Sequence, residues 1–89
     1  MTAVIEPATP GDVPAMVSLL VDAGLPTEGL GDHLVSAVVG RAGTSVVATA
    51  AVELYGDAAL LRSVAVARTA RGNGIGVRIA RAALDVPHA

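Results

Sequence analysis

The first strongly patterned segment, residues 9–24, has the spacing of an amphipathic helix. Its apolar residues recur three and four positions apart and therefore share one face: Val13, Met16, Val17, Leu20 and Val21. Thr9 can cap this helix, Pro10 suits its first position, and Asp12 follows three residues after the cap. Gly24 is a natural C-terminal stop. The pattern predicts a helix that begins after Thr9 and ends near Gly24.

The segments on either side of this helix are shorter and less strongly patterned. Residues 4–8 begin with β-branched side chains and predict a strand, which Pro7 confines to an edge or an end of a sheet. Residues 33–39 are consistent with a short helix running into a strand, or with strand throughout. Residues 41–44 predict a turn.

Two longer strands are predicted in the second half of the chain. Residues 45–55 are rich in Val, Thr and Ala, and residues 55–58 have the composition of a hairpin connection. Residues 59–66 are apolar except at Arg62 and Ser63, which predicts a strand covered on both faces. A last helix is predicted from its apolar positions, Val77, Ile79, Ala80, Ala83 and Leu84. The order is β-α-(α)-β-β-β-α, in one domain spanning residues 1–89.

Composition excludes several chemistries. The 89 residues contain no Cys and only two His, which excludes thiolate catalysis, Cys-ligated zinc and a His-rich metal site. All six basic residues are Arg, so a Walker lysine and a Schiff base are also excluded. The net charge of −2 and the single Tyr argue against nucleic-acid binding. No apolar run is long enough to span a membrane and no signal peptide is present, so we expect a cytoplasmic protein with no membrane partner.

The most informative feature is the glycine-rich segment 71–76, which lies between a predicted strand and a predicted helix. Gly72, Gly74 and Gly76 stand at every second position and let a ligand approach the backbone. The free N–H groups at the helix start favour an anion, and Arg71 adds a bidentate phosphate donor. A phosphate-bearing cofactor is the natural ligand, and the alternative is a strand–helix turn that binds nothing. The spacing matches neither the dinucleotide fingerprint nor the Walker loop.

This segment resembles motif A of the GNAT acetyltransferases. Their signature, (Arg/Gln)-x-x-Gly-x-(Gly/Ala), is matched by Arg71, Gly74 and Gly76. Residues 5–12 resemble the opening strand and first helix of the same family, while residues 24–27 and 53–66 resemble its arsenic-resistance N-acetyltransferase branch. The resemblance implies an α+β, three-layer half-domain with a mostly antiparallel sheet.

The resemblance also implies that the cofactor is acetyl-coenzyme A. In the family, the cofactor's pyrophosphate lies on the amides of the glycine turn, which are here those of Arg71, Gly72, Asn73, Gly74, Ile75, Gly76 and Val77. Its pantetheine arm runs beside the preceding strand, here Val64, Ala65 and Val66. A backbone N–H near Val64 polarises the acetyl carbonyl. The implied activity is transfer of an acetyl group to the amine of a small molecule.

Residues near the predicted cleft are candidates for the remaining roles. Glu53 is our candidate general base, acting directly or through water, and otherwise a solvated strand residue. Arg62 either pairs with Glu53 or contacts an anionic group of the acceptor or cofactor. Ser63 hydrogen-bonds either the acceptor or the backbone. Tyr55 lines the acceptor pocket or belongs to the core. No metal ligands are expected.

The chain departs from the family in length. Family domains continue after this helix with another strand, a helix and usually two more strands, so we expect the C-terminal strands to be missing. This leaves two alternatives to an enzyme: a non-catalytic module that needs a dimer partner or second chain, and a fragment of a longer reading frame. An unpaired strand edge also favours a homodimer.

Overall fold

The computed structural model describes residues 3–85, apart from the side chains of residues 32, 33, 35, 54 and 55. The strands are β1 (Val4–Pro7), β2 (Ala37–Ala42), β3 (Ser45–Tyr55) and β4 (Ala58–Val66), and the α-helices are α1 (Val13–Asp22) and α2 (Ile75–Asp85). Short 3-10 helices occur at η1 (Pro10–Asp12), η2 (Gly31–Ser36) and η3 (Arg68–Ala70). The predicted order of elements is confirmed, and η2 is the short helix that runs into β2.

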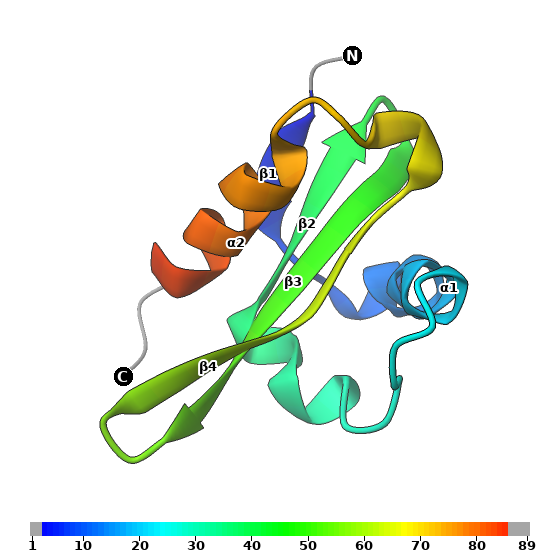
Figure 1. Cartoon of the computed structure of the whole chain (residues 1–89). Coiled ribbons are helices and arrows are strands. Elements are labelled where there is room, and N and C mark those ends of the chain that lie inside the picture. The colour runs from blue at the N-terminus through cyan, green and yellow to red at the C-terminus, as the bar shows by residue number, and fades with distance from the viewer. Residues whose placement is uncertain (1–2, 86–89) are drawn as a thin grey trace.

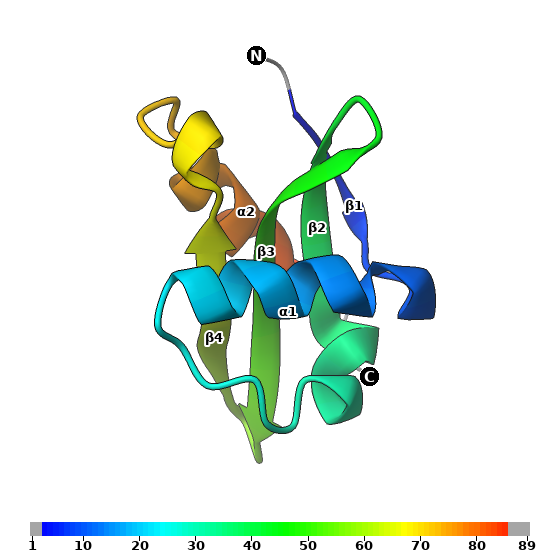
Figure 2. The ribbon, with the colours of Figure 1, turned by 90° about the vertical axis from the view of Figure 1, so that its right-hand side faces the viewer.

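The four strands form one antiparallel sheet in the order β1-β2-β3-β4. Helix α2 covers one face of the sheet and α1 the other (Figure 1), and Figure 2 shows α1 lying across the sheet with α2 behind it. A buried cluster lies on each face: Val38, Ala48, Val52, Ile75 and Ile79 on the α2 side, and Met16, Leu20, Val39, Ala51 and Ala65 on the α1 side. This confirms the three-layer α+β fold.

Helix α1 buries a slightly different face from the predicted one. Its first turn is the 3-10 helix η1, so the α-helix proper begins at Val13. Met16 and Leu20 are fully buried as predicted, but Val21 is 63% exposed and Leu19 is only 8% exposed. The helix is therefore rotated so that residue 19, rather than residue 21, faces the sheet. Gly24 follows the helix with a φ of +72°, which confirms its role as the stop.

Helix α2 packs tightly on the sheet because β2 carries a glycine beneath it. A Cβ at Gly40 would lie 3.3 Å from the Ala48 side chain and 3.4 Å from that of Ile75. A side chain at position 40 would therefore require the side chains of Ala48 and Ile75 to shift by a few tenths of an ångström. Ile75, Ile79 and Ala83 form the buried stripe of α2. None of the helices between residues 3 and 85 is long and apolar enough to cross a membrane.

Strand β4 is an edge strand of a sheet that α1 and α2 cover on its two faces, as the apolar sequence of residues 59–66 predicted, but β4 itself is only partly buried. Its first three residues are exposed, the next four are half-buried, and Ala65 alone is buried. Among the described residues, only β3 pairs with β4, which agrees with the unpaired strand edge expected from the sequence.

The pairing of β3 with β4 contains a bulge. Ala51 pairs with Arg62 and Thr49 pairs with Ala65, so one residue between them on β3 faces two on β4, Ser63 and Val64. Ser63 has a φ of +57°, which is the left-handed region that residues other than Gly, Asn and Asp seldom adopt. No pattern in the sequence indicated this bulge.

The predicted turn at residues 41–44 is shorter in the structure. Strand β2 continues through Ala42, and Arg41 pairs with Val4 on β1 and with Val46 on β3. The turn consists of residues 43 and 44, and Gly43 supplies the positive φ of +63° that it requires. Arg41 is therefore held rigidly in the sheet instead of lying in a loop.

Candidate functional site

The glycine-rich turn leads directly into the start of α2, and the space beside its backbone is open. Gly72 and Gly74 have φ values of +88° and +72°, and a Cβ at either would meet no atom within 4 Å. The carbonyl of Gly74 accepts a 3.1 Å hydrogen bond from the N–H of Arg78, which closes the first helical turn. The N–H groups that precede it, at residues 75–77, have no partner within the helix. The turn thus presents backbone donors beside open space.

A groove of about 260 Å³ lies between this turn and the end of β4. Seven of the ten residues predicted to bind the cofactor line it: Val66, Arg71, Gly72, Gly74, Ile75, Gly76 and Val77. Gly76 lies directly against β4, because a Cβ there would be 3.7 Å from Val66 Cγ2. The strand end, the turn and the first helical turn therefore form one surface.

The other three predicted cofactor residues do not line this groove. The side-chain amide of Asn73 donates a 3.4 Å hydrogen bond to the carbonyl of Ala70, within the turn. Val64 is half-buried and packs against the core on the α2 side, while Ala65 belongs to the core on the α1 side. Of these three, Ala65 is buried, so a ligand can contact it only through its backbone, whereas Asn73 is exposed.

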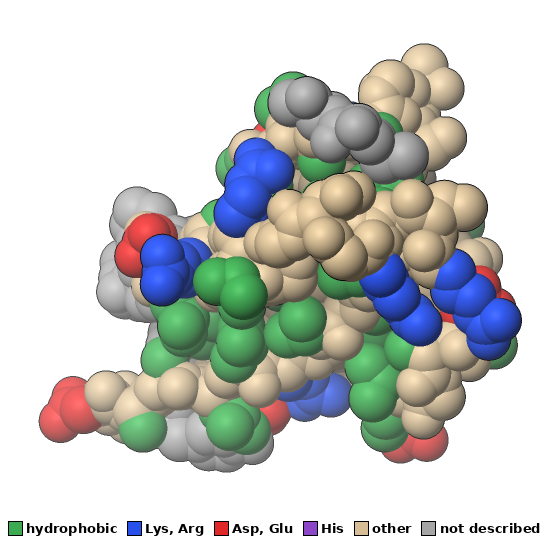
Figure 3. Space-filling view, turned by 45° about the horizontal axis from the view of Figure 1, so that its top comes forward, with side chains coloured by type: hydrophobic (Ala, Val, Ile, Leu, Met, Phe, Trp, Pro, Cys, Tyr) green, Lys and Arg blue, Asp and Glu red, His purple; other side chains and the backbone are tan. Residues whose placement is uncertain are grey.

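The part of the chain that forms the groove is rich in arginine, although Arg71 is the arginine whose side chain lines the groove. Four of the six, Arg68, Arg71, Arg78 and Arg81, lie in residues 68–84, a stretch that contains no acidic residue. In Figure 3, basic side chains flank a hydrophobic surface at this end of the molecule. Arg71 Nε donates a 3.1 Å hydrogen bond to the carbonyl of Val66, which fixes the guanidinium beside the groove. The sequence pointed to Arg71 as a phosphate donor and placed Arg78 and Arg81 on the polar side of the last helix, with contact to a cofactor phosphate as the lesser alternative.

The candidate catalytic pair lies on the other face of the sheet. Arg62 Nη1 and Glu53 Oε2 are 2.8 Å apart, and their side chains are 28% and 21% exposed. The salt bridge, one of the two alternatives for Arg62, is therefore confirmed. Ala51, which pairs with Arg62, belongs to the α1-side cluster, so this ion pair also lies on the α1 side.

The ion pair is tied to the loop that follows α1. Arg62 Nη2 donates a 3.4 Å hydrogen bond to the carbonyl of Glu28. Ser63 is the next residue and belongs to the bulge of β4. The backbone of Tyr55 ends β3, and its side chain lies outside the described part of the structure. Of the predicted acceptor residues, Arg62 is thus paired with Glu53 and Ser63 follows it in the bulge, whereas the groove lies beyond the bulge.

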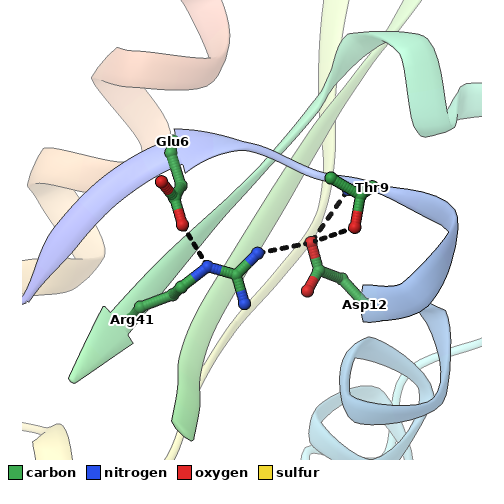
Figure 4. A network of polar contacts seen from close by, with 4 residues as sticks. All are labelled: Glu6, Thr9, Asp12 and Arg41. Carbon is green, nitrogen blue, oxygen red and sulfur yellow. Dashed lines mark hydrogen bonds and ion pairs between the residues drawn. The ribbon is translucent and has the colours of Figure 1, made fainter. Parts of the chain in front are cut away.

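A second charged network, which sequence reasoning missed, joins β1, β2 and η1 (Figure 4). Arg41 Nε donates to Glu6 Oε1, and Arg41 Nη2 lies 2.7 Å from Asp12 Oδ2. The same oxygen accepts hydrogen bonds from the backbone N–H of Thr9 at 2.8 Å and from its hydroxyl at 3.1 Å. The predicted interaction between Thr9 and Asp12 is confirmed, but assigning Arg41 to a turn concealed its role.

This network sets the ionisation of Asp12. The backbone N–H of Thr9 is the main cause that holds the pKa of the Asp12 carboxyl below its ordinary value of 3.8. The burial of this carboxyl opposes the effect, while Arg41 reinforces it. The hydrogen bond to Asp12 likewise raises the pKa of Arg41. Asp12 therefore stays ionised although its side chain is 92% buried.

No protein-family model matches the sequence, and no curated protein matches it. Solved structures do resemble it. Rv2747 from Mycobacterium tuberculosis, solved in complex with coenzyme A, superposes with a TM-score of 0.83 and 26% identity over 93% of this chain and 56% of its own. Diaminobutyrate acetyltransferase EctA from Paenibacillus lautus, in complex with L-2,4-diaminobutyric acid and coenzyme A, superposes with a TM-score of 0.79 and 18% identity. The match covers 94% of this chain and 57% of EctA.

N-acetylglutamate synthase from Neisseria gonorrhoeae, complexed with coenzyme A and N-acetyl-glutamate, gives a TM-score of 0.80 and 22% identity over 96% of this chain and 22% of its own. These neighbours are GNAT acetyltransferases. The chain has a partial GNAT fold. It spans little more than half the length of Rv2747. The specific resemblance to the arsenic-resistance branch stays a prediction.

Proposed function

We propose that this chain binds acetyl-coenzyme A and transfers its acetyl group to the amine of a small molecule. The observation that carries the proposal is the groove between Val66 and the first turn of α2. It combines a glycine turn, a helix N-terminus and a local excess of arginine. Three structural neighbours with the same fold were crystallised with coenzyme A.

The residues of the groove fit the phosphate part of coenzyme A. The space beside Gly72 and Gly74 is open where a side chain would otherwise lie, so an anion can reach the backbone amides. The α2 N-terminus favours negative charge, and Arg71 can donate from the terminal nitrogens of its guanidinium. We assign the pyrophosphate to residues 71–77 and the pantetheine arm to the backbone of residues 64–66. When bound, acetyl-coenzyme A supplies the activated acetyl group.

The bulge of β4 has a role in this proposal. A bulge interrupts the pairing of a strand and leaves backbone groups without their ladder partners. The strained conformation of Ser63 lies at this point, next to Val64. We propose that the backbone N–H near Val64 donates to the acetyl carbonyl, where negative charge develops during transfer. Strain at such a position is typical of functional sites.

The acceptor amine must lose a proton, and the leaving thiolate must gain one. We assign removal of the amine proton to Glu53, directly or through a water molecule, with Arg62 holding its carboxylate in place. Ser63, Arg62 and Tyr55 are our candidates for contact with the acceptor. The EctA neighbour was solved with its substrate L-2,4-diaminobutyric acid, which supports a small amine as the acceptor class.

Calorimetric titration of the purified chain with acetyl-coenzyme A tests the first half of the proposal. We expect saturable binding near one site per chain. Desulfo-coenzyme A, which keeps the phosphates but lacks the thiol, should compete with it. Absence of saturable binding would overturn the proposal.

The alternative is a non-catalytic module completed by a dimer partner or a second chain. Its basis is the edge strand β4, which pairs only with β3 in the described part of the chain. Sedimentation at several concentrations reports a dimer. Release of thiol in the presence of small amines reports activity. Thiol release by the monomer excludes this alternative, while release only at dimer-forming concentrations supports completion by a partner.

A further inference from the structure

A second and larger hollow lies away from the glycine turn, between α1 and the β2–β3 hairpin. Its volume is about 580 Å³, within the range of small-molecule sites. Helix α1 forms one wall and residues 41–46 form part of the other. Leu19 and Val46 contribute apolar surface, and Ser18 and Ser45 contribute hydroxyl groups. Nothing in the proposed acetyl transfer uses this hollow.

Two residues of the charged network of Figure 4, Asp12 and Arg41, line this hollow. All the hydrogen bonds of the Asp12 carboxylate go to Oδ2, and those of Arg41 come from Nε and Nη2. In the described part of the chain, Asp12 Oδ1 and Arg41 Nη1 therefore have no protein partner. Figure 4 shows both atoms on the same side of the network.

The positions of these two atoms are fixed, which distinguishes them from mobile surface groups. The Asp12 side chain is only 8% exposed, and Arg41 is anchored by Glu6 as well as by Asp12. A carboxylate oxygen beside a guanidinium nitrogen matches a ligand with an N–H donor beside a carbonyl acceptor. A group held in one geometry loses little entropy when it binds such a ligand.

Charge and shape restrict the ligand further. Asp22, at the far end of α1, also lines the hollow, so Asp12, Asp22 and Arg41 give it a net negative charge. We propose that the hollow binds a small aliphatic cation with an ammonium group next to a carbonyl, as in an amino-acid amide. The ammonium donates to Asp12 Oδ1, the carbonyl accepts from Arg41 Nη1, and the aliphatic part covers Leu19 and Val46.

The test is an NMR titration of the ¹⁵N-labelled chain with L-leucinamide, a probe that carries all three groups. We expect saturable shifts at the backbone amides of residues 15–19 and 41–46, with a dissociation constant in the millimolar range. N-acetyl-L-leucine, which lacks the ammonium and carries a negative charge, should not produce them. Equal shifts with both probes, or no saturable shift at these residues, overturn the proposal.

Two variants of α1 make the test specific without disturbing the charged network. Ser18→Leu places a larger side chain in the hollow and should weaken leucinamide binding by about ten-fold or more. Val21→Leu is the control, because Val21 is exposed on the same helix and does not line the hollow. Equal affinity of the two variants refutes the site. This inference is independent of acetyl transfer, since the groove at residues 71–77 can bind coenzyme A in every one of these outcomes.

Discussion

Substitution of Gly74 by Asp is the most direct test of the proposed phosphate site at residues 71–77. Gly74 lines the groove at a φ of +72°, and an added Cβ there meets no atom within 4 Å. Asp tolerates the left-handed conformation better than most residues, so the fold should survive. A carboxylate at this position would face the proposed pyrophosphate site and would oppose anion binding at the N-terminus of α2.

The expected magnitude follows from the charges. Two unit charges about 5 Å apart repel by about 3 kcal/mol at an effective dielectric constant near 20. The groove is open and Gly74 is exposed, so salt and solvent reduce this value. We expect acetyl-coenzyme A to bind Gly74→Asp about 10- to 100-fold more weakly than the unchanged chain, which corresponds to about 1.4–2.8 kcal/mol.

The β2–β3 turn offers a matched control. Gly43 has a φ of +63°, and a Cβ there also meets nothing within 4 Å, so Gly43→Asp adds the same charge and a similar backbone strain away from the groove. Calorimetry at fixed ionic strength should give this control nearly the affinity of the unchanged chain. Unchanged affinity in Gly74→Asp, or equal losses in both variants, would refute the assignment of the phosphates to this turn.

Three further predictions concern stability, measured by urea or thermal unfolding. The pKa of Asp12 is lowered in the folded state, so this carboxylate stabilises the fold above about pH 4, and the stabilisation is lost as the pH falls through the pKa of the folded state. Asp12→Asn should remove this part of the acid dependence of stability. An unchanged pH profile of stability in the variant would contradict the prediction. Arg41→Ala leaves two carboxylates without their cation and should destabilise the fold by about 1–3 kcal/mol, whereas the exposed Arg81→Ala should change stability by less than about 0.5 kcal/mol. Thr49 is fully buried, and its hydroxyl has no hydrogen-bond partner among the described residues. Thr49→Val should therefore stabilise the fold by about 1 kcal/mol. A loss of stability in this variant would contradict the prediction and would show that the hydroxyl has a partner.

Local patterns in the sequence predicted the elements well because each element carries its own signals. The cap at Thr9, the stop at Gly24 and the spacing of Met16 and Leu20 all act within a few residues. The glycine turn was predicted for the same reason, since its positive φ values and the helix start are adjacent in sequence. Most of the candidate cofactor residues therefore lie where the motif placed them.

Features that depend on distant partners could not be predicted from local patterns. Arg41 joins residues about 30 positions away, and in sequence it stands among turn-forming residues. The rotation of α1 that buries Leu19 depends on the shape of the sheet beneath it.

The bulge in β4 determines which helix its last residues face. Arg62 and Ala65 lie on the α1 side although they are three residues apart, while Val64 and Val66 pack on the α2 side. Strict alternation from Arg62 would instead direct positions 64 and 66 towards α1, away from the glycine turn. Deletion of Ser63 would therefore remove the bulge and leave Val64, Ala65 and Val66 on their present faces, whereas regular pairing with Ser63 retained would turn these three residues over. A single inserted residue therefore decides which helix Val64 and Val66 face.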